Sequence, residues 1–312
     1  LQRLDVSRGF LPTHVQTNVE FALPNLPADT IISRNPGIVD LLADDSLELI
    51  WIPGGGDAAE VGQRVEQTLQ SGKHVIIGSA TEFSPDDWLK LEKLSLVKEK
   101  MIRIHFPGEF ESGFQLAART VGSGKLGRLR SILCLEYAFA GPVVVPSDTP
   151  LHAVGDPLAE RGIFVTRGLE ALYQIVSLHP APVERIYARA SNESELLLQL
   201  EFADGLTAQW EYAVDRTAPL RTGWQLEGTQ GGFADRHAYR VEADGELVKT
   251  PLEPVMMPTD PFLGAVYEAL RSADSQKQTP SAQYRQVFQL AAATRRSLAG
   301  GNWVDVEQDL LP

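Results

Sequence analysis

The stretch that decides the fold runs from Leu47 to Ile77 and reads LELIWIPGGGDAAEVGQRVEQTLQSGKHVII. Its opening segment, Leu47–Ile52, is mostly apolar, as expected of a strand that is buried on both faces of a parallel sheet. Three glycines then interrupt the strand, and Asp57 stands where a helix needs an N-terminal cap. The apolar residues that follow recur at helical spacing: Val61, Val65 and Leu69. Gly72 ends the helix and His74–Ile77 forms a second strand, so the stretch predicts a β-α-β unit.

The same alternation continues along the chain. Ser84, Pro85 and two aspartates predict another helix, because a serine cap, a proline in the first turn and early acidic residues are typical of helix starts. A third apolar segment, Ile102–Phe106, follows that helix. The first part of the chain is therefore predicted to be a doubly wound α/β domain.

Beyond Gly122-Ser123-Gly124 the pattern changes to longer alternating strands, and an Asp204-Gly205 pair is typical of a tight hairpin. The predicted strands are 129–139, 184–190, 196–202 and 206–214. One helix interrupts them, with an apolar stripe of Val165, Leu169, Leu172, Tyr173 and Val176. Two more helices and a short strand at 303–306 close the chain, which predicts a mainly antiparallel α/β domain.

Composition excludes several classes of function. The formal net charge of -13 disfavours nucleic-acid and membrane partners, which both need basic surfaces. No apolar run approaches the roughly 20 residues that span a bilayer, so we expect a soluble protein. Cys134 is the single cysteine, which excludes an intramolecular disulfide and favours a cytoplasmic location. No cluster of His, Cys and carboxylates has metal-ligand spacing, so no metal site is predicted.

Three motifs together resemble those of the Gfo/Idh/MocA oxidoreductases: Gly72-Lys73-His74-Val75-Ile76-Ile77, Gly124-Lys125-Leu126-Gly127-Arg128-Leu129 and Gly228-Thr229-Gln230-Gly231-Gly232. The resemblance implies a Rossmann-like domain at 1–122 and a C-terminal substrate and oligomerisation domain at 123–312. The second domain would carry a large, mostly antiparallel open sheet that makes a homo-oligomer interface. The activity implied is hydride transfer between NAD(P) and a sugar, cyclitol or related hydroxy compound.

The dinucleotide-binding positions depart from that family. A Rossmann site needs glycines after the first strand so that a pyrophosphate can approach the helix amides. In the matching stretch, residues 4–12, only Gly9 is retained and Pro12 removes an amide donor, which favours a structural turn. Ser33 and Arg34 have the arrangement that holds the 2′-phosphate of NADP, since a guanidinium matches phosphate oxygens. A solvated loop arginine is the alternative.

Glycine-rich strand ends supply the other candidate cofactor contacts: Pro53, Gly54, Gly55 and Gly78. Glycine-rich backbone before a helix start can bind an anion. A tight strand-to-helix turn is the favoured explanation, because Asp57 would repel phosphate. We therefore expect no cofactor, or NADP or NAD if these positions are used.

The catalytic side chains that the resemblance implies are also replaced. Ser79 stands in place of the lysine of a Glu-Lys-Pro motif, which polarises the reacting hydroxyl. Phe164, at the end of residues 160–164, stands in place of the histidine that serves as acid or base. The candidate substitutes are His105, Glu109 and Glu160. A histidine bonded to backbone and surface carboxylates are the alternative interpretation.

Aromatic residues alternate with polar ones on the predicted strands: Trp210, Tyr212 and Trp224. They favour a sheet face for subunit packing, with a platform for a sugar ring as the alternative. Two functional hypotheses remain. The first is a pseudoenzyme that has lost dehydrogenase chemistry and acts as a binding, scaffold or regulatory subunit for a sugar-like ligand. The second is an active NAD(P)-dependent oxidoreductase with relocated acid-base residues.

Overall fold

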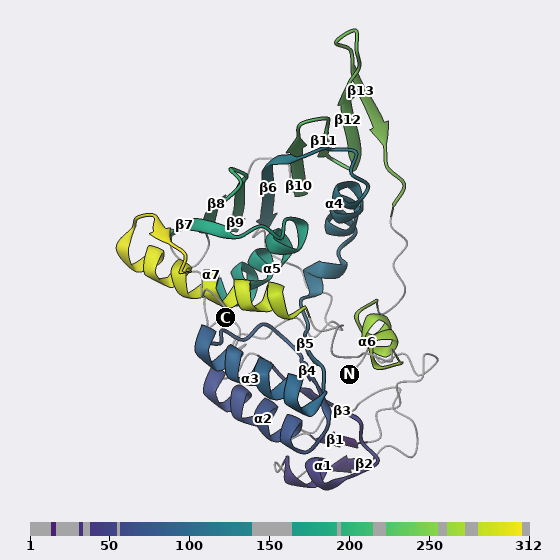
Figure 1. Ribbon diagram of the computed structural model, residues 1–312, viewed down its shortest axis with the longest axis vertical. Helices are drawn as coiled ribbons and strands as arrows, with labels where there is room; N and C mark the ends of the chain where they lie inside the picture. The colour runs from purple at the N-terminus through teal and green to yellow at the C-terminus, as the bar shows by residue number, and fades with distance from the viewer. Residues whose placement is uncertain are drawn as a thin grey trace. The chain divides into compact units, whose positions relative to one another are not determined.

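The computed structural model describes residues 14–16, 31–33, 38–54, 57–138, 164–191, 195–214, 223–254, 261–271 and 280–307. The chain forms two compact units (Figure 1). Unit 1 comprises residues 1–81, 89–105 and 256–280, and unit 2 comprises 82–88, 106–255 and 281–312. The predicted α/β fold class is confirmed, because unit 1 contains a parallel sheet and unit 2 a large, mostly antiparallel one.

Unit 1 is built on a parallel sheet in the order β3 (Leu49–Ile52), β4 (His74–Ile77) and β5 (Ile102–Ile104). Helix α2 (Ala58–Gln70) joins β3 to β4, and α3 (Pro85–Lys98) precedes β5. The same unit contains β1 (His14–Gln16), β2 (Ile31–Ser33), α1 (Val39–Ala43) and α6 (Pro261–Arg271). The predicted β-α-β unit is thus confirmed.

Local signals set the boundaries of α2 and α3. Asp57 caps α2 by accepting a hydrogen bond from the Ala59 amide at 2.7 Å. Gly72 follows the helix with φ of +76°, a conformation that suits glycine. Ser84 accepts the Asp87 amide at 3.1 Å and donates to the Asp87 carboxylate at 2.7 Å, which caps the start of α3. Both predicted helix starts are confirmed.

The predicted apolar stripe of α2 lies in the core of unit 1. Val61, Val65 and Leu69 are all buried, as are Val75 and Ile77 on β4. Each such side chain contributes about 1.5–3 kcal/mol by leaving water. Burial of this stripe against the strands holds the strand ends of the parallel sheet in place.

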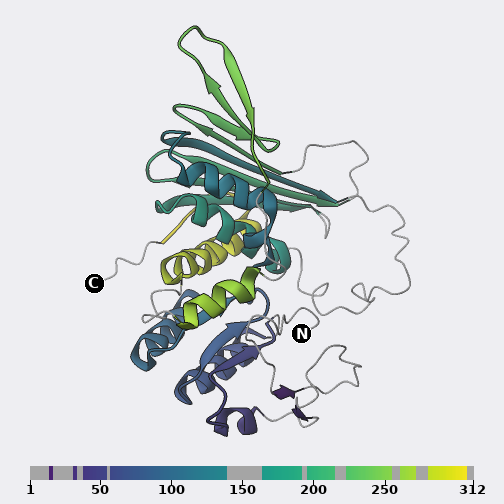
Figure 2. The same cartoon turned by 90° about the vertical axis from the view of Figure 1, so that its right-hand side faces the viewer.

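Unit 2 contains a nine-stranded sheet in the order β13-β12-β11-β10-β6-β9-β8-β7-β14 (Figure 2). The strands predicted from alternation are β6 (Leu129–Ala138), β7 (Val183–Ser191), β8 (Glu195–Phe202) and β9 (Thr207–Val214). The other five are β10 (Gly223–Gly228), β11 (Gly232–Ala234), β12 (His237–Val241), β13 (Leu247–Pro251) and β14 (Val304–Asp305). Among the strands that the structure describes, only β6 and β9 pair in parallel within this sheet, so the predicted antiparallel character is confirmed.

Helices lie on one face of this sheet. They are α4 (Ser112–Gly122), α5 (Leu169–Leu178) and α7 (Ser281–Gly300), which Figure 2 shows on the same side. A 3-10 turn, η2 (Pro107–Phe110), precedes α4, and a π-helical turn, η4 (Phe164–Gly168), precedes α5. Burial alternates along β8, where Leu196, Leu198, Leu200 and Phe202 are buried. The apolar face of the sheet is therefore the one that the helices cover.

An aromatic cluster explains why residues 82–88 belong to unit 2. The ring centroid of Trp88 lies 5.3 Å from that of Tyr284 and 5.0 Å from that of Phe288 on α7. Phe83 contacts Phe288 at 5.5 Å. Buried aromatic pairs of this kind contribute beyond their area alone. This short segment therefore supplies part of the core of unit 2.

Two of the motifs that carried the family resemblance meet in unit 2. The Arg128 amide donates to Thr229 Oγ1 at 3.0 Å, and the Gln230 amide donates to the Leu126 carbonyl at 2.9 Å. Gly127 has φ of +68°, and a Cβ there would lie 2.4 Å from Thr229 Oγ1. The glycine is required by this close approach. Hydrogen bonds between the two motifs therefore hold the β10–β11 turn against the start of β6.

The prediction that Trp210 and Trp224 lie on a sheet face for subunit packing is wrong. Trp210 and Trp224 are buried, and Trp224 packs on Phe114 of α4 with ring centroids 5.5 Å apart. Their strand positions point to the face that the helices cover, so unit 2 itself covers them. Tyr212, the third residue of that set, is half-buried.

Candidate functional site

Several predicted cofactor positions lie together at one edge of unit 1. Gly54 follows β3 and Gly78 and Ser79 follow β4, so parallel strands bring them to the same end of the sheet. A Cβ on Gly54 would lie 2.2 Å from the Ser79 carbonyl oxygen and 2.7 Å from its Oγ. Pro53 beside them is exposed. The turn after β3 thus packs directly on the turn after β4.

His105 follows β5 at the same edge. Its Nδ1 lies 3.3 Å from the Gly78 carbonyl oxygen, and its ring lies 4.4 Å from Phe262 of α6 and 5.8 Å from Trp51, between ring centroids. A Cβ on Gly78 would lie 2.2 Å from Trp51 Nε1. His105 is half-buried, so it bonds to backbone within an aromatic cluster and still reaches solvent.

These contacts test whether a dinucleotide fits the described part of unit 1. The space beside Gly54 and Gly78 is filled by atoms of Ser79 and Trp51. The two glycines therefore permit close packing of the chain on itself and do not form an open cradle for a pyrophosphate. Gly9, Arg34 and Gly55 lie outside the described residues, as does the side chain of Ser33.

Phe164, which is predicted to stand at the histidine position, lies in the core of unit 2. It is 4% exposed, and a Cβ on Gly168 would lie 2.5 Å from its ring. The Arg295 guanidinium lies 4.9 Å from the ring centroid. Glu82 holds that guanidinium through two hydrogen bonds of 2.8 and 2.5 Å. The position is thus closed by an aromatic ring and a paired cation.

The remaining predicted substitutes lie in the η2 turn or outside the described residues. Glu109 lies in the η2 turn and is half-buried. Glu160 is outside the described residues. Among the described residues, no group of three or more His, Cys, Asp or Glu side chains is arranged to hold a metal ion.

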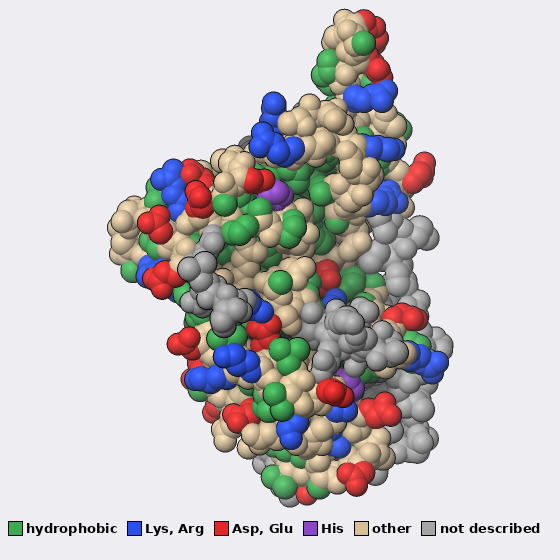
Figure 3. Space-filling model, viewed as in Figure 1, with side chains coloured by type: hydrophobic (Ala, Val, Ile, Leu, Met, Phe, Trp, Pro, Cys, Tyr) green, Lys and Arg blue, Asp and Glu red, His purple; other side chains and the backbone are tan. Residues whose placement is uncertain are grey.

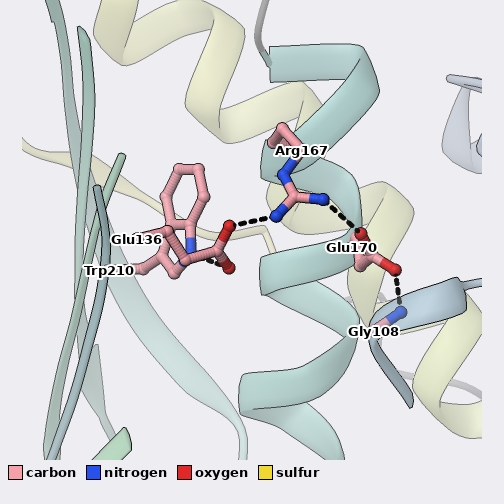
Figure 4. A network of polar contacts seen from close by, with 5 residues as sticks. All are labelled: Gly108, Glu136, Arg167, Glu170 and Trp210. Atoms are coloured by element: carbon pink, nitrogen blue, oxygen red, sulfur yellow. Dashed lines mark hydrogen bonds and ion pairs between the residues drawn. The ribbon is translucent and has the colours of Figure 1, made fainter. Parts of the chain in front are cut away.

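A polar network in unit 2 was not predicted (Figure 4). Trp210 Nε1 donates to Glu136 Oε1 at 2.9 Å, and Arg167 donates to Glu136 Oε2 at 2.5 Å. The same guanidinium lies 3.6 Å from Glu170 Oε2. Glu170 Oε1 accepts a hydrogen bond from the Gly108 amide. The network thereby connects the sheet, the π-helical turn, α5 and the η2 turn.

The charges in this network are unbalanced. Burial raises the pKa of Glu170 to about 7; the Gly108 amide and Arg167 oppose that rise, while Glu111 and Glu136 add to it. Burial and then Glu136 raise the pKa of the Glu111 carboxyl. Burial alone would lower the pKa of Arg167, but Glu136 and Glu170 raise it. The cluster therefore contains a carboxyl group that exchanges a proton near neutral pH.

One sequence signal could have identified part of the network. Glu136 lies two residues after the buried Cys134, so its side chain belongs to the face of β6 that the helices cover. A charge at such a position needs a partner. The partner is 31 residues away in Arg167, and no spacing rule connects the two.

Surface charge offers no single-sign patch on the face drawn in Figure 3. Basic and acidic side chains are interspersed there over both units. None of the described helices is both long and apolar enough to span a membrane.

Neither family models nor curated proteins match the sequence. Solved structures do resemble it. The probable oxidoreductase yhhX is 16% identical with a TM-score of 0.75, covering 95% of this chain and 91% of that one. An NAD-binding protein from Listeria innocua is 17% identical with a TM-score of 0.68, covering 89% and 84%. An aldose-aldose oxidoreductase from Caulobacter crescentus, complexed with glycerol, is 16% identical with a TM-score of 0.65, covering 90% and 85%.

These likenesses define the class of fold. The chain has the two-part α/β fold of oxidoreductases, over most of its own length and most of theirs. The resemblance to the Gfo/Idh/MocA oxidoreductases is thereby confirmed at the level of the fold. Activity and ligand require arguments from the site itself.

Proposed function

We propose that this protein is a pseudoenzyme of the oxidoreductase fold that binds a sugar-like small molecule and acts as a binding, scaffold or regulatory subunit without a resident cofactor. The observation that carries the proposal is the buried ring of Phe164 beneath the Arg295–Glu82 pair. An alcohol that surrenders a hydride must also surrender a proton, and a phenyl ring cannot accept one.

The Arg295 guanidinium over the Phe164 ring does not take the role of a proton-carrying histidine. Both hydrogen bonds of the Arg295 guanidinium described above go to the Glu82 carboxylate, and burial has only a secondary effect on its pKa, which that partner raises. An arginine so paired stays protonated at neutral pH and does not act as a base. Ser79 likewise brings a hydroxyl where a lysine would bring charge. The two losses together support loss of hydride transfer.

A second candidate is an active NAD(P)-dependent oxidoreductase with relocated acid-base residues. Two observations favour it: Glu170 has a pKa of about 7 because of burial, and His105 is half-buried at the strand ends of unit 1. Groups that titrate near neutral pH suit acid-base catalysis. Ser33 and Arg34 would then be the residues that favour NADP over NAD.

The sugar-like ligand is proposed from the fold, since one structurally similar protein is an aldose-aldose oxidoreductase. A homo-oligomer formed through the open face of the unit 2 sheet and a location in the cytoplasm belong to the same proposal. On that open face Leu197 and Gln199 of β8 alternate with the buried residues. A mixed apolar and polar face of this kind suits contact between subunits.

Titration with NADPH and NADH, followed by nicotinamide fluorescence, tests the proposal. We expect no saturable change for either nucleotide up to millimolar concentration, and saturable heat from at least one aldose or polyol in calorimetry. Turnover of a sugar with NAD(P) that is lost in His105→Ala would refute the proposal and establish the second candidate. The matched control is His179→Ala, because His179 follows the C-terminal end of α5 and pairs with Asp204.

A further inference from the structure

The Glu170 carboxyl group links the η2 turn directly to α5. Its Oε1 accepts the Gly108 amide, and a Cβ on Gly108 would lie 2.6 Å from Gln174 Nε2, one turn further along α5. The turn therefore lies against the helix with no room for a side chain at Gly108. Within the part of the chain that the structure describes, the Gly108 amide donates to the Glu170 carboxylate.

The charges around Glu170 do not balance. Glu111 faces it from the start of α4, Glu136 from β6 and Arg167 from the π-helical turn. Helix α7 meets α5 through two phenol rings, those of Tyr284 and Tyr173, with centroids 5.6 Å apart. Three carboxylates therefore share one guanidinium. If all of them were ionised, the cluster would carry an uncompensated negative charge in a partly desolvated place.

Glu170 is the carboxylate best placed to take up a proton. Arg167 bonds to Glu136 at 2.5 Å but lies 3.6 Å from Glu170. The Glu170 side chain is 9% exposed against 23% for Glu136. The more buried carboxylate thus has the weaker ion pair, and protonation removes the larger desolvation penalty there. Its Oε2 receives the proton, because Oε1 accepts the Gly108 amide.

We propose that Glu170, Arg167 and Glu136 form a proton-binding site that controls how firmly the Pro107–Phe110 turn is held to α5. When Glu170 is ionised, the Gly108 amide donates to a charged acceptor and Arg167 is shared between two carboxylates. When Glu170 is protonated, the Gly108 hydrogen bond becomes a weaker neutral one and Arg167 pairs with Glu136 alone. The state of the turn that carries Glu109 then depends on pH. This goes beyond the proposed function and holds whether or not a ligand binds.

Carbon-13 NMR of the glutamate carboxyl groups tests the site across about pH 5 to about pH 9. We expect one carboxyl resonance to titrate near neutral pH, and the Gly108 amide proton resonance to follow the same midpoint. In Glu170→Gln that carboxyl transition disappears and the Gly108 resonance no longer titrates. The matched control is Glu201→Gln, which removes an exposed partner of Arg185 on the same unit and should leave the transition unchanged.

Two variants that retain Glu170 give shifts of opposite sign. In Glu136→Gln, Arg167 is released toward Glu170 and a neighbouring negative charge is lost, so the midpoint moves to lower pH. In Arg167→Met the compensating cation is lost, so the midpoint moves to higher pH. These shifts also test the site if Glu170→Gln does not fold. A carboxyl that titrates only below about pH 5.5, or midpoints unmoved by both variants, would overturn the assignment.

Discussion

In unit 1, Lys73 and His74 bond to backbone atoms, whereas in unit 2 four polar side chains bond to one another. Lys73 is buried and donates to the carbonyls of Asp44 at 2.6 Å and Leu47 at 3.0 Å. His74 Nδ1 accepts the Met101 amide at 3.0 Å. In unit 2, by contrast, Trp210, Glu136, Arg167 and Glu170 form a chain of side-chain contacts (Figure 4).

The difference determines which unit can respond to its surroundings. A backbone carbonyl or amide does not titrate, so a side chain bonded to it changes its arrangement only when that side chain itself gains or loses a proton. Charged partners change with protonation, so a network of them has more than one arrangement. Near neutral pH these backbone contacts therefore form a fixed framework in unit 1, whereas the network in unit 2 contains a carboxyl group that can change state.

Replacing a core tryptophan should have the largest effect and tests which unit residues 82–88 support. Trp88→Ala should reduce the free energy of unfolding by about 3–5 kcal/mol, because a large ring leaves a cavity beside Tyr284 and Phe288. Hydrogen exchange should rise in α5 and α7 of unit 2. Trp51→Ala is the matched control, since that ring is 42% exposed and its loss should be smaller. Equal losses of unfolding free energy for the two variants would contradict the assignment of residues 82–88 to the core of unit 2.

Removing the ammonium group of Lys73 tests the fixed framework. Lys73→Met should reduce the free energy of unfolding by about 2 kcal/mol, because two buried carbonyl acceptors lose their donor. Chemical denaturation measures the loss. Lys98→Met, at the exposed end of α3, should change stability by less than about 0.5 kcal/mol. A loss at Lys73 no greater than at Lys98 would show that the two bonds do not stabilise unit 1.

Replacing Glu170 tests the unit that can change state. Burial raises the folded-state pKa of Glu170 from 4.5 to about 7, so its contribution is fully present below about pH 4.5 and is lost as pH rises through 7. Between about pH 5 and about pH 8, the free energy of unfolding of Glu170→Gln should therefore rise by about 1–2 kcal/mol relative to that of the native protein. Denaturation at several pH values measures this difference. A constant difference would mean that Glu170 does not change its protonation state.

Replacing His74 should give the smallest effect, with the opposite sign. Burial, and then Lys100, lower the folded-state pKa of His74 from 6.5 to about 4, so stability is present above pH 6.5 and declines as pH falls toward 4. His74→Asn keeps an acceptor for the Met101 amide and does not titrate. The variant should lose less stability on acidification, by on the order of 1 kcal/mol after solvent screening. Parallel acid denaturation curves would contradict this.

Burial decides which elements the sequence could predict. The α2 stripe and the alternation of β8 were readable because one side of each element is buried. Strands β12 and β13 were missed, since both lie largely in solvent and impose no period on their residues. The π-helical turn at Phe164–Gly168 was predicted as ordinary helix, because its apolar residues match helical spacing.

The candidate site was harder to predict than the fold. The resemblance of motifs led to the prediction that Ser79 and Phe164 stand in place of a lysine and a histidine, and that stays a prediction. The network around Arg167 was not, because its members come from four separate segments that meet only in the folded chain. Charge pairs between distant residues produce no periodic pattern in the sequence. The one local indication of this network was Glu136, a charged residue on the buried face of a strand.

The interleaving of the two units has a consequence for how such a protein can evolve. The backbone passes from one unit to the other after residues 81, 88, 105, 255 and 280. Exchange of either unit with a related protein by recombination would therefore require several simultaneous crossovers in the gene. An insertion or deletion confined to one unit can therefore shift the segments of the other, because each unit is assembled from several separate stretches of the same chain.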